Sequence, residues 1–390
     1  MIGQLGRGAT AALLFHSALI QALTFLIRPA ATYRALELDV PDYALGALAA
    51  SYAVVPLLLA IPTGGLVDRL GEKRLILAGS LVVLSSAVFL LFYGTSVTAL
   101  IIGSALLGAG QLTCVVGQQA VVANNAAASR LDSGFGYLTF AASLGQAAGP
   151  LAISLIGGSA VRPDTGALFI LSAAMCVVLV ATGFFIPGRR SLRHAGGTPA
   201  PAPGGVSALL NTPGLVRALA TSATVLAVVD LTVVYLPALG AERGLSAGTV
   251  GLMLAVRAVF SMVSRLWLGQ LSRWLGRTAL LVWSLLLSTV ALALAAVPMP
   301  EWLLFIVLAL LGLGLGIGQP LTMSWLTAQA PPGQRGRALA LRLAGNRIGQ
   351  VILPSSIGVV AAGLGASGVL LAAALVVGGT LLLVRGVSLD

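Results

Sequence analysis

Apolar residues fill most of the chain in stretches of about 20, and short polar turns separate one stretch from the next. A helix of that length crosses the hydrocarbon core of a bilayer, so the pattern predicts twelve membrane-spanning helices. The sequence therefore predicts an all-α membrane protein. The expected spans cover residues 9–33, 43–66, 74–94, 97–121, 133–157, 166–187, 214–239, 246–270, 278–297, 302–327, 337–362 and 367–385.

One polar stretch is much longer than the turns and divides the spans six and six. Residues 188–212 hold three arginines followed by a run of glycine, proline and alanine, which is typical of a flexible, partly extended linker. We expect an N-terminal six-helix bundle over residues 1–187, a cytoplasmic linker over 188–212 and a C-terminal six-helix bundle over 213–390.

Two sequence motifs of the first half return in the second half. The segment Gly64–Arg74 is repeated in weaker form by Gly269–Arg277, 205 positions later, and Gly145–Pro150 is repeated by Gly349–Pro354, 204 positions later. Two copies of one membrane unit are how secondary transporters build a midplane site that opens to either side. The repeats therefore predict two pseudo-symmetric bundles and suggest transport by alternating access.

The composition agrees with this prediction and argues against several other classes of protein. Hydrophobic residues make up 58% of the chain, charged residues 8%, and the mean hydropathy is +1.02. Cys114 and Cys176 both fall in predicted spans, so we expect neither a disulfide framework nor a metal site. No catalytic cluster of histidine, cysteine or carboxylates stands out, so we expect no enzyme, and no phosphate-binding loop or other cofactor motif is present. Uphill transport would therefore draw on an ion gradient, most simply of protons.

Lysine and arginine residues are distributed unequally between the two sets of loops. The side that holds the N-terminus collects fourteen of them and the opposite side only three. By the positive-inside rule, both termini are cytoplasmic, and we expect a multi-pass protein of the cytoplasmic (inner) membrane. The net charge of +11 is thus a topology signal, and no nucleic-acid partner is expected.

The segment 64–74 resembles the signature that major facilitator superfamily transporters carry between their second and third helices. The family pattern is Gly-x-Leu-x-Asp-Arg-x-Gly followed by basic residues, and only Glu72 departs from it. The resemblance covers the whole chain and implies that this loop latches one conformation; a solvated charged turn is the alternative. The latch residues would be Gly64, Leu66, Asp68, Arg69, Gly71, Lys73 and Arg74, with Gly269, Gly276 and Arg277 in the second copy.

Gly145, Gly149 and Pro150 in the fifth span resemble the helix-five motif of proton-coupled drug exporters in the same superfamily. That resemblance favours export, whereas close helix packing through Gly-x-x-x-Gly is the alternative interpretation. Those exporters usually carry an arginine in their fourth helix, and the fourth span here has none. A coupling residue must therefore be sought elsewhere.

Charged residues inside the predicted spans are the main candidates for a site, because each costs at least about 2.5 kcal/mol in a bilayer. Asp230 and Arg257 lie at similar distances from the turn near Arg243, and Arg28 lies near the repeat-equivalent position of Asp230. We predict that Arg28, Asp230 and Arg257 form one layer that binds an anionic or zwitterionic substrate, with Asp230 as proton carrier. A purely structural triad is the alternative.

Neutral and basic residues could complete the site. The eleventh span carries Arg342, Asn346, Arg347 and Gln350, of which Arg347 and Asn346 are the better candidates. Tyr235, Gln111 and Gln319 could supply specificity, but hydrogen bonding between helices is the favoured role for each of them.

The sequence thus predicts a monomeric, proton-coupled secondary transporter of a small organic solute, with export favoured. Buried arginines outnumber the single buried acid, which points to an anionic or amphiphilic substrate. The alternatives are proton-coupled uptake of an organic anion and multidrug efflux of lipophilic compounds. The expected partners are the substrate and the lipid bilayer.

Overall fold

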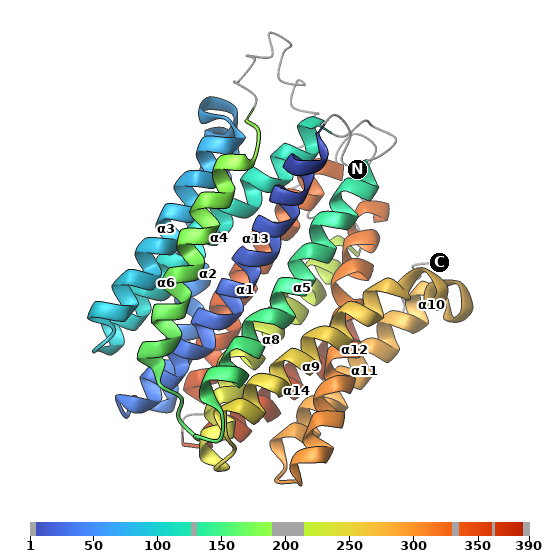
Figure 1. The fold of residues 1–390 in the computed structure, drawn as a ribbon. Coiled ribbons are helices and arrows are strands. Elements are labelled where there is room, and N and C mark those ends of the chain that lie inside the picture. The colour runs from blue at the N-terminus through green and yellow to red at the C-terminus, as the bar shows by residue number, and fades with distance from the viewer. Residues whose placement is uncertain (1–4, 126–130, 189–213, 330–334, 361–362, 385–390) are drawn as a thin grey trace. The chain divides into compact units, whose positions relative to one another are not determined.

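The computed structural model describes residues 5–125, 131–188, 214–329, 335–360 and 363–384. Within these ranges the chain forms thirteen helices (Figure 1), twelve with at least 20 residues and α10 with eight, so each predicted span corresponds to one long helix. The helices are α1 (Arg7–Glu37), α2 (Asp42–Leu70), α3 (Glu72–Tyr93), α4 (Val97–Asn125), α5 (Leu131–Gly157), α6 (Thr165–Phe185), α8 (Leu215–Glu242), α9 (Ala247–Leu266), α10 (Leu268–Leu275), α11 (Arg277–Ala296), α12 (Glu301–Gln329), α13 (Arg335–Val360) and α14 (Gly365–Val384).

Contacts divide the chain into two compact units. The first unit holds Met1–Arg193 together with Leu236–Ala255, and the second holds His194–Tyr235 and Val256–Asp390. The turn between α8 and α9 belongs to the first unit because it is bonded to the end of α5: the amide of Ala247 donates to the carbonyl of Ala160 at 2.6 Å. The predicted bundle boundaries stay a prediction, and most of the predicted linker lies outside the described residues.

The internal repeat is visible as matched close approaches between helices. In the first unit a Cβ added at Gly108 would lie 1.9 Å from the Tyr52 carbonyl oxygen; in the second, one added at Gly312 would lie 2.3 Å from that of Arg257. These two pairs are offset by 204 and 205 positions. The same offsets relate the approach of Gly110 to Gly79, between α3 and α4, to the approach of Gly314 to Ser284, between α11 and α12. Each unit therefore packs its helices through the same contacts.

Two glycines of the repeated loop motif have nearly identical backbone conformations. Gly71 precedes α3 with φ 82° and ψ 157°, and Gly276 precedes α11 with φ 77° and ψ 155°. This region of backbone space is essentially restricted to glycine. The sharp entry into both helices therefore requires glycine at these two positions.

Alanine at Gly71 or Gly276 is expected to destabilise the protein by about 1–3 kcal/mol, because a side chain is strained in that conformation. Thermal unfolding of purified protein in detergent would measure the loss. Gly379→Ala on α14 is the control, since its Cβ would meet nothing within 4 Å. Equal melting temperatures for all three variants and the wild type would contradict the prediction.

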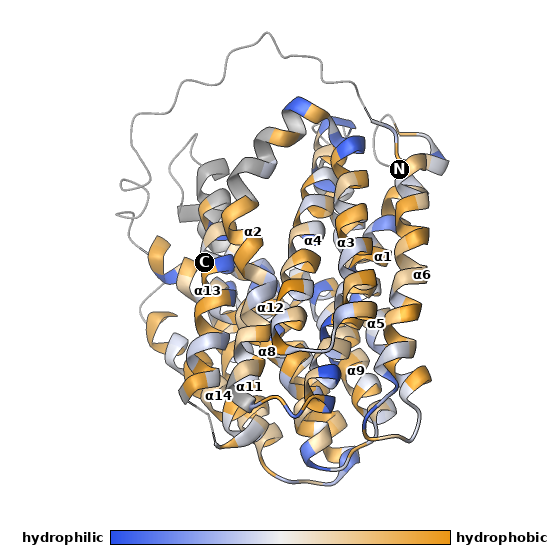
Figure 2. Cartoon of the chain, turned by 90° about the vertical axis from the view of Figure 1, so that its left-hand side faces the viewer, coloured by the Kyte–Doolittle hydropathy of each residue, from blue (hydrophilic) through white to orange (hydrophobic). Residues whose placement is uncertain are grey.

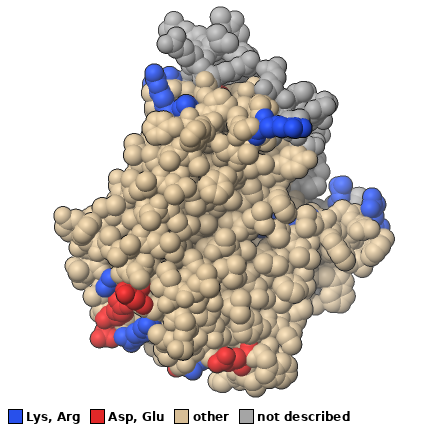
Figure 3. All heavy atoms as spheres, in the orientation of Figure 1, with Lys and Arg blue, Asp and Glu red and all other residues tan. Residues whose placement is uncertain are grey.

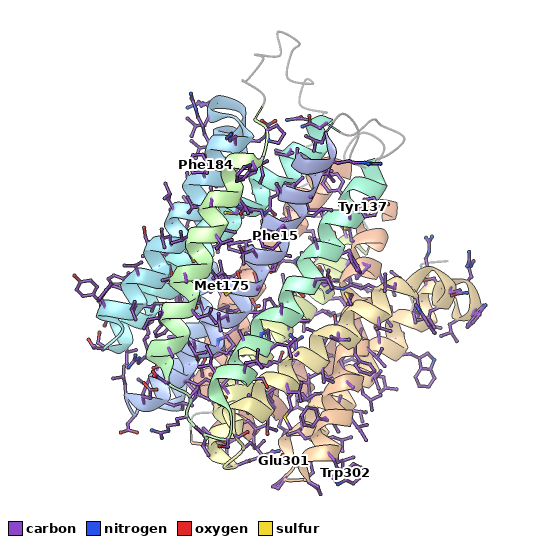
Figure 4. All side chains as sticks on the ribbon, viewed as in Figure 1. Phe15, Tyr137, Met175, Phe184, Glu301 and Trp302 are labelled. Atoms are coloured by element: carbon purple, nitrogen blue, oxygen red, sulfur yellow. The ribbon has the colours of Figure 1, made fainter. Side chains whose placement is uncertain are left out.

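Most residues of the helices are hydrophobic, as the colouring in Figure 2 shows. Phe15, Tyr137 and Phe184, labelled in Figure 4, are all at least half exposed, on α1, α5 and α6. Ten of the described helices are long and apolar enough to cross a membrane. Large apolar side chains exposed on this scale are suited to lipid as the surrounding solvent, which agrees with a multi-pass membrane protein.

The core of the first unit contains a buried hydrogen-bond chain. Gln118 donates to Nδ1 of His16 at 2.8 Å, Nε2 of His16 lies 3.0 Å from the Ser80 hydroxyl, and that hydroxyl donates to the Ile76 carbonyl. Every donor in this chain has an acceptor, so α1, α3 and α4 are joined without an unpaired polar group at its centre.

One predicted span is wrong at its end. The pattern predicted a continuous helix over 246–270, but α9 ends at Leu266 and a separate short helix, α10, begins at Leu268. The break falls at Trp267, whose ψ of 0° does not continue an α-helix. The corresponding α2 of the first unit runs without interruption to Leu70.

Candidate functional site

In the first unit, the buried cation of the predicted layer lies against an aromatic ring. Arg28 on α1 is 4% exposed, and its guanidinium carbon lies 4.3 Å from the ring centroid of Tyr52 on α2. A cation over a desolvated ring is attracted by about 2 kcal/mol. In the internal repeat, the position equivalent to Tyr52 is occupied by Arg257 in the second unit.

In the second unit, a glutamine joins an acid to an arginine. Gln350 on α13 donates through Nε2 to Oδ2 of Asp230 on α8, and its Oε1 accepts from Nη1 of Arg347 at 3.1 Å. Asp230 is 5% exposed and Gln350 3%. The side-chain amide of Gln350 therefore links the Asp230 carboxylate to the Arg347 guanidinium, and these two hydrogen bonds fix the orientation of the amide.

Arg257 is held in the same unit by backbone packing. It is 3% exposed on α9, and the close approach of Gly312 fixes its backbone against α12. Asp230 attracts its charge and Arg265 repels it. Within the described residues, Nε of Arg257 has no hydrogen-bond partner, so a buried cationic donor remains for another molecule.

A second polar network in this unit joins α8, α12 and α13. Arg342 donates to Oε1 of Gln319 at 2.6 Å and to the Gln319 carbonyl at 3.1 Å. Gln319 in turn donates to the Ser222 carbonyl, and the Ser222 hydroxyl donates to Oδ1 of Asn346. Gln319 and Asn346 therefore make contacts between helices, a role that the sequence already favoured for Gln319, and Arg342 is 8% exposed.

Two further predicted site residues are buried, one in each unit. Gln111 on α4 is 7% exposed and lies one turn after Gly108, on the side of α4 that meets Tyr52. Tyr235 on α8 is fully buried. Arg28 belongs to the first unit and Asp230 and Arg257 to the second, so the three-residue layer stays a prediction.

Sequence reasoning missed three partners of the predicted residues. Tyr52 under Arg28 and Ser222 beside Asn346 carried no signal, since both are ordinary residues of apolar spans. Gln350 could have been chosen, because it lies one turn after Arg347 on α13 and a helix brings such positions together.

The predicted latch loop is only partly described. Lys73 donates to the Phe184 carbonyl at 2.7 Å, and Asn124 donates to Glu72 at 2.6 Å, so the start of α3 is tied to the ends of α6 and α4. The side chain of Asp68 lies outside the described residues. Leu66, Arg69, Arg74 and Arg277 are exposed, and Gly269 lies in α10 with open space around it. Gly64 lies within α2, which runs to Leu70, whereas Gly71 and Gly276 lie in the loops before α3 and α11.

The fifth-span motif lies at a close contact between α1 and α5. A Cβ added at Gly145 would lie 1.9 Å from the Ala18 carbonyl oxygen, and one at Gly149 would lie 2.3 Å from that of Ala22. The carbonyl of Pro150 approaches Gly251 of α9, where an added Cβ would lie 2.6 Å from it. Packing alone therefore accounts for both glycines of the motif.

The site contains cations, amides and one carboxylate rather than metal ligands. Within the described ranges, no group of three or more His, Cys, Asp or Glu side chains could hold a metal ion. The groups present can bind an anion through arginine.

Comparison with known proteins identifies the family. Residues 13–282 and 219–388 match the sequence model of the Major Facilitator Superfamily. The solved nucleoside transporter NupG is 14% identical, with a TM-score of 0.77 over 96% of this chain and 97% of that chain. A POT family transporter in complex with a thioalcohol conjugated peptide is 12% identical, with a TM-score of 0.74 over 96% and 94% of the two chains. A peptide transporter POT in complex with sulfate is 18% identical, with a TM-score of 0.74 over 97% and 95%.

At such identities the structural likenesses show a common fold, and no curated protein matches the chain significantly. The family match covers nearly the whole chain in two overlapping parts. With twelve long helices within the described residues and its repeated packing contacts, the chain belongs to the major facilitator superfamily of membrane transporters.

Proposed function

We propose that this protein is a proton-coupled secondary transporter of small organic anions or zwitterions, including amphiphilic ones, and that it works by alternating access. The observation that carries the proposal is the pair of groups in the second unit: Arg257, whose buried Nε has no described partner, and Asp230, which Gln350 links to Arg347. Together they offer a cationic donor and a group that can carry a proton.

The charge of the substrate follows from how the buried arginines are used. Arg342 donates to Gln319, and Arg28 lies over Tyr52. Arg257 and Arg347 lie in the same unit as the buried carboxylate of Asp230, so positive charge exceeds negative charge among these three residues. A substrate carboxylate or phosphate would balance the excess, and arginine can hold either with two parallel hydrogen bonds.

Proton coupling would operate through competition for the arginines. When Asp230 carries a proton, it no longer balances a guanidinium charge, and the substrate anion takes its place. When the substrate leaves, Asp230 gives up the proton and balances the charge again. This cycle uses only groups already in place, and it needs no cofactor.

The proposed direction is export from the cytoplasm across the inner membrane, with both termini cytoplasmic and the chain acting as a monomer. It follows the helix-five resemblance and the distribution of basic residues. In the first unit, Figure 3 shows acidic side chains at the end away from the α2–α3 turn, and Glu37, Asp39 and Asp164 lie at that end. This arrangement supports the positive-inside orientation.

The test begins with ligand-dependent thermal stabilisation of the purified protein by organic carboxylates, phosphate esters, short peptides, uncharged nucleosides and lipophilic cations. We expect anions and zwitterions to stabilise the wild type. Arg257→Gln is expected to lose that stabilisation, with affinity about tenfold or more weaker, because a charged hydrogen bond is lost. Arg7→Gln, an exposed arginine at the start of α1, is the matched control.

Transport in proteoliposomes of known orientation would then decide direction, with the best ligand and an imposed pH gradient. Stabilisation by lipophilic cations, unchanged in Arg257→Gln, would contradict the proposal and favour multidrug efflux. Accumulation driven only toward the cytoplasmic face would replace export by uptake.

A further inference from the structure

An apolar groove lies on the second unit beside the break between α9 and α10. Its volume is about 240 Å³, and α9, α10, α11 and α12 all contribute to its walls. The groove exists because α10 turns away from the line of α9 at Trp267 and projects from the unit, as Figure 1 shows. Its lining includes Ser264, Trp267, Leu271, Trp283, Ser284 and Leu313.

The polar groups of the lining need no ligand of their own. The Ser264 hydroxyl donates to the Ser261 carbonyl at 2.9 Å, and the Ser284 hydroxyl donates to the Leu281 carbonyl at 2.8 Å. Apart from these two serines, the side chains that line the groove are aliphatic or aromatic. An apolar chain therefore fits this groove better than a polar solute.

The residues around the groove are those that mark a membrane interface. Trp267, Trp274 and Trp283 are at least 60% exposed, and they are three of the five tryptophans in the chain. Tryptophan prefers the headgroup level of a bilayer, where its ring is in apolar surroundings and its N–H can donate to a polar group.

The charge at this end of the unit is positive. Arg273 on α10 and Arg277 at the start of α11 are exposed, and Figure 3 shows basic side chains over the projecting α10 region. Arg277 lies one turn before Leu280, which lines the groove, and so on the groove side of α11. The sequence between Ala247 and Ala296 holds four arginines and no Asp or Glu.

We propose that this groove binds one phospholipid with an anionic headgroup, whose acyl chain lies between α9 and α11 and whose phosphate lies near Arg273 and Arg277. Basic pockets beside transmembrane helices recognise anionic headgroups on the cytoplasmic side, and the positive-inside rule predicts that side for α10. The lipid would hold α10 in the interface and fill the space left by the break at Trp267. This site is separate from Asp230 and Arg257 and does not depend on the substrate.

Native mass spectrometry of the detergent-purified protein with equimolar phosphatidylglycerol and phosphatidylcholine would test the proposal. We expect one phosphatidylglycerol to be retained preferentially. Arg273→Gln and Arg277→Gln should each reduce that preference by about fivefold. Arg7→Gln, an exposed arginine at the start of α1 on the same predicted side, should leave it unchanged.

A groove-filling variant separates this site from general affinity for lipid. Leu287→Trp fills the groove from α11 and should abolish retention, whereas Val290→Trp, exposed on the same helix but outside the lining, should not. Val263→Trp fills the groove from the α9 wall and serves if Leu287→Trp does not fold. Equal retention of the two lipids, retention by both filled variants, or a protein dimer in place of bound lipid would overturn the proposal.

Discussion

Replacing Asp230 with asparagine is expected to abolish proton-driven accumulation while leaving substrate exchange intact. With a pH gradient of about one unit, one coupled proton supplies about 1.4 kcal/mol, which sustains about tenfold accumulation of substrate. Asparagine cannot carry that proton, so the accumulation ratio should fall to one. Exchange of labelled for unlabelled substrate needs no net proton movement and should persist.

Asparagine at position 230 is expected to remove the proton site while keeping the hydrogen bond that Asp230 accepts. Gln350 donates to Oδ2 of Asp230, and the amide oxygen of asparagine can accept the same hydrogen bond without a change of shape. The link through Gln350 to Arg347 at 3.1 Å can therefore survive. Loss of coupling in this variant would reflect the missing proton site rather than a collapsed network.

Two further variants separate the proton site from its surroundings. Asp164→Asn changes an exposed acid that caps α6, where its side chain accepts from the Ala167 amide, and should leave coupling unchanged. Gln350→Leu removes the bridge but keeps the carboxylate, and should weaken coupling and substrate binding together. If Asp230→Asn folds and still accumulates substrate on a pH gradient, Asp230 is not the proton carrier and a structural role is the better explanation.

The fold could be predicted further than the site because its signals are local and repeated. Spans follow from stretches of apolar residues, and the repeat at offsets of 204 and 205 positions recurs in the structure as paired contacts such as Gly145 with Ala18 and Gly349 with Ala223. The break at Trp267 could not be predicted, because neither glycine nor proline occupies that position and the residues around it are apolar.

From the sequence, the charged residues of the site could be predicted but not the residues that contact them. An ionisable residue inside a span stands out in the sequence because placing its charge in the bilayer costs free energy. For this reason Arg28, Asp230 and Arg257 were predicted. Their partners depend on how each helix is rotated and shifted against its neighbour, and Gln350 reaches Asp230 across 120 positions of sequence. A single sequence carries no direct record of such pairings, so the hydrogen bonds that join Gln319 to Ser222 and Arg342 could not be predicted.

Alanine at Gly145 is expected to destabilise the protein strongly, because it forces two tightly packed helices apart. The new Cβ would lie 1.9 Å from the Ala18 carbonyl oxygen and 2.9 Å from the Ala22 amide nitrogen, both of them backbone atoms that no rotamer change can move. α1 and α5 must separate, at a cost of about 3 kcal/mol. The melting temperature in detergent should fall by roughly 5–10 °C.

The repeat supplies a graded series for the same measurement. At Gly349, the equivalent position on α13, the nearest atom to an added Cβ is the Ala223 side chain at 2.8 Å, so Gly349→Ala should cost less. Gly136 lies on α5 with nothing within 4 Å, and Gly136→Ala should be neutral or slightly stabilising, because alanine favours the helix. Any other order would mean that helix contact does not explain the fifth-span glycines.

Transport assays on the same variants separate packing from the role that the exporter resemblance implies. If Gly145→Ala loses stability and activity in parallel, packing of α5 on α1 is sufficient to explain the motif. If a folded Gly145→Ala protein binds substrate but no longer exchanges it, then the close contact is needed for the conformational change itself. The second result would support export as the direction, because it would give the helix-five motif a function that packing alone does not require.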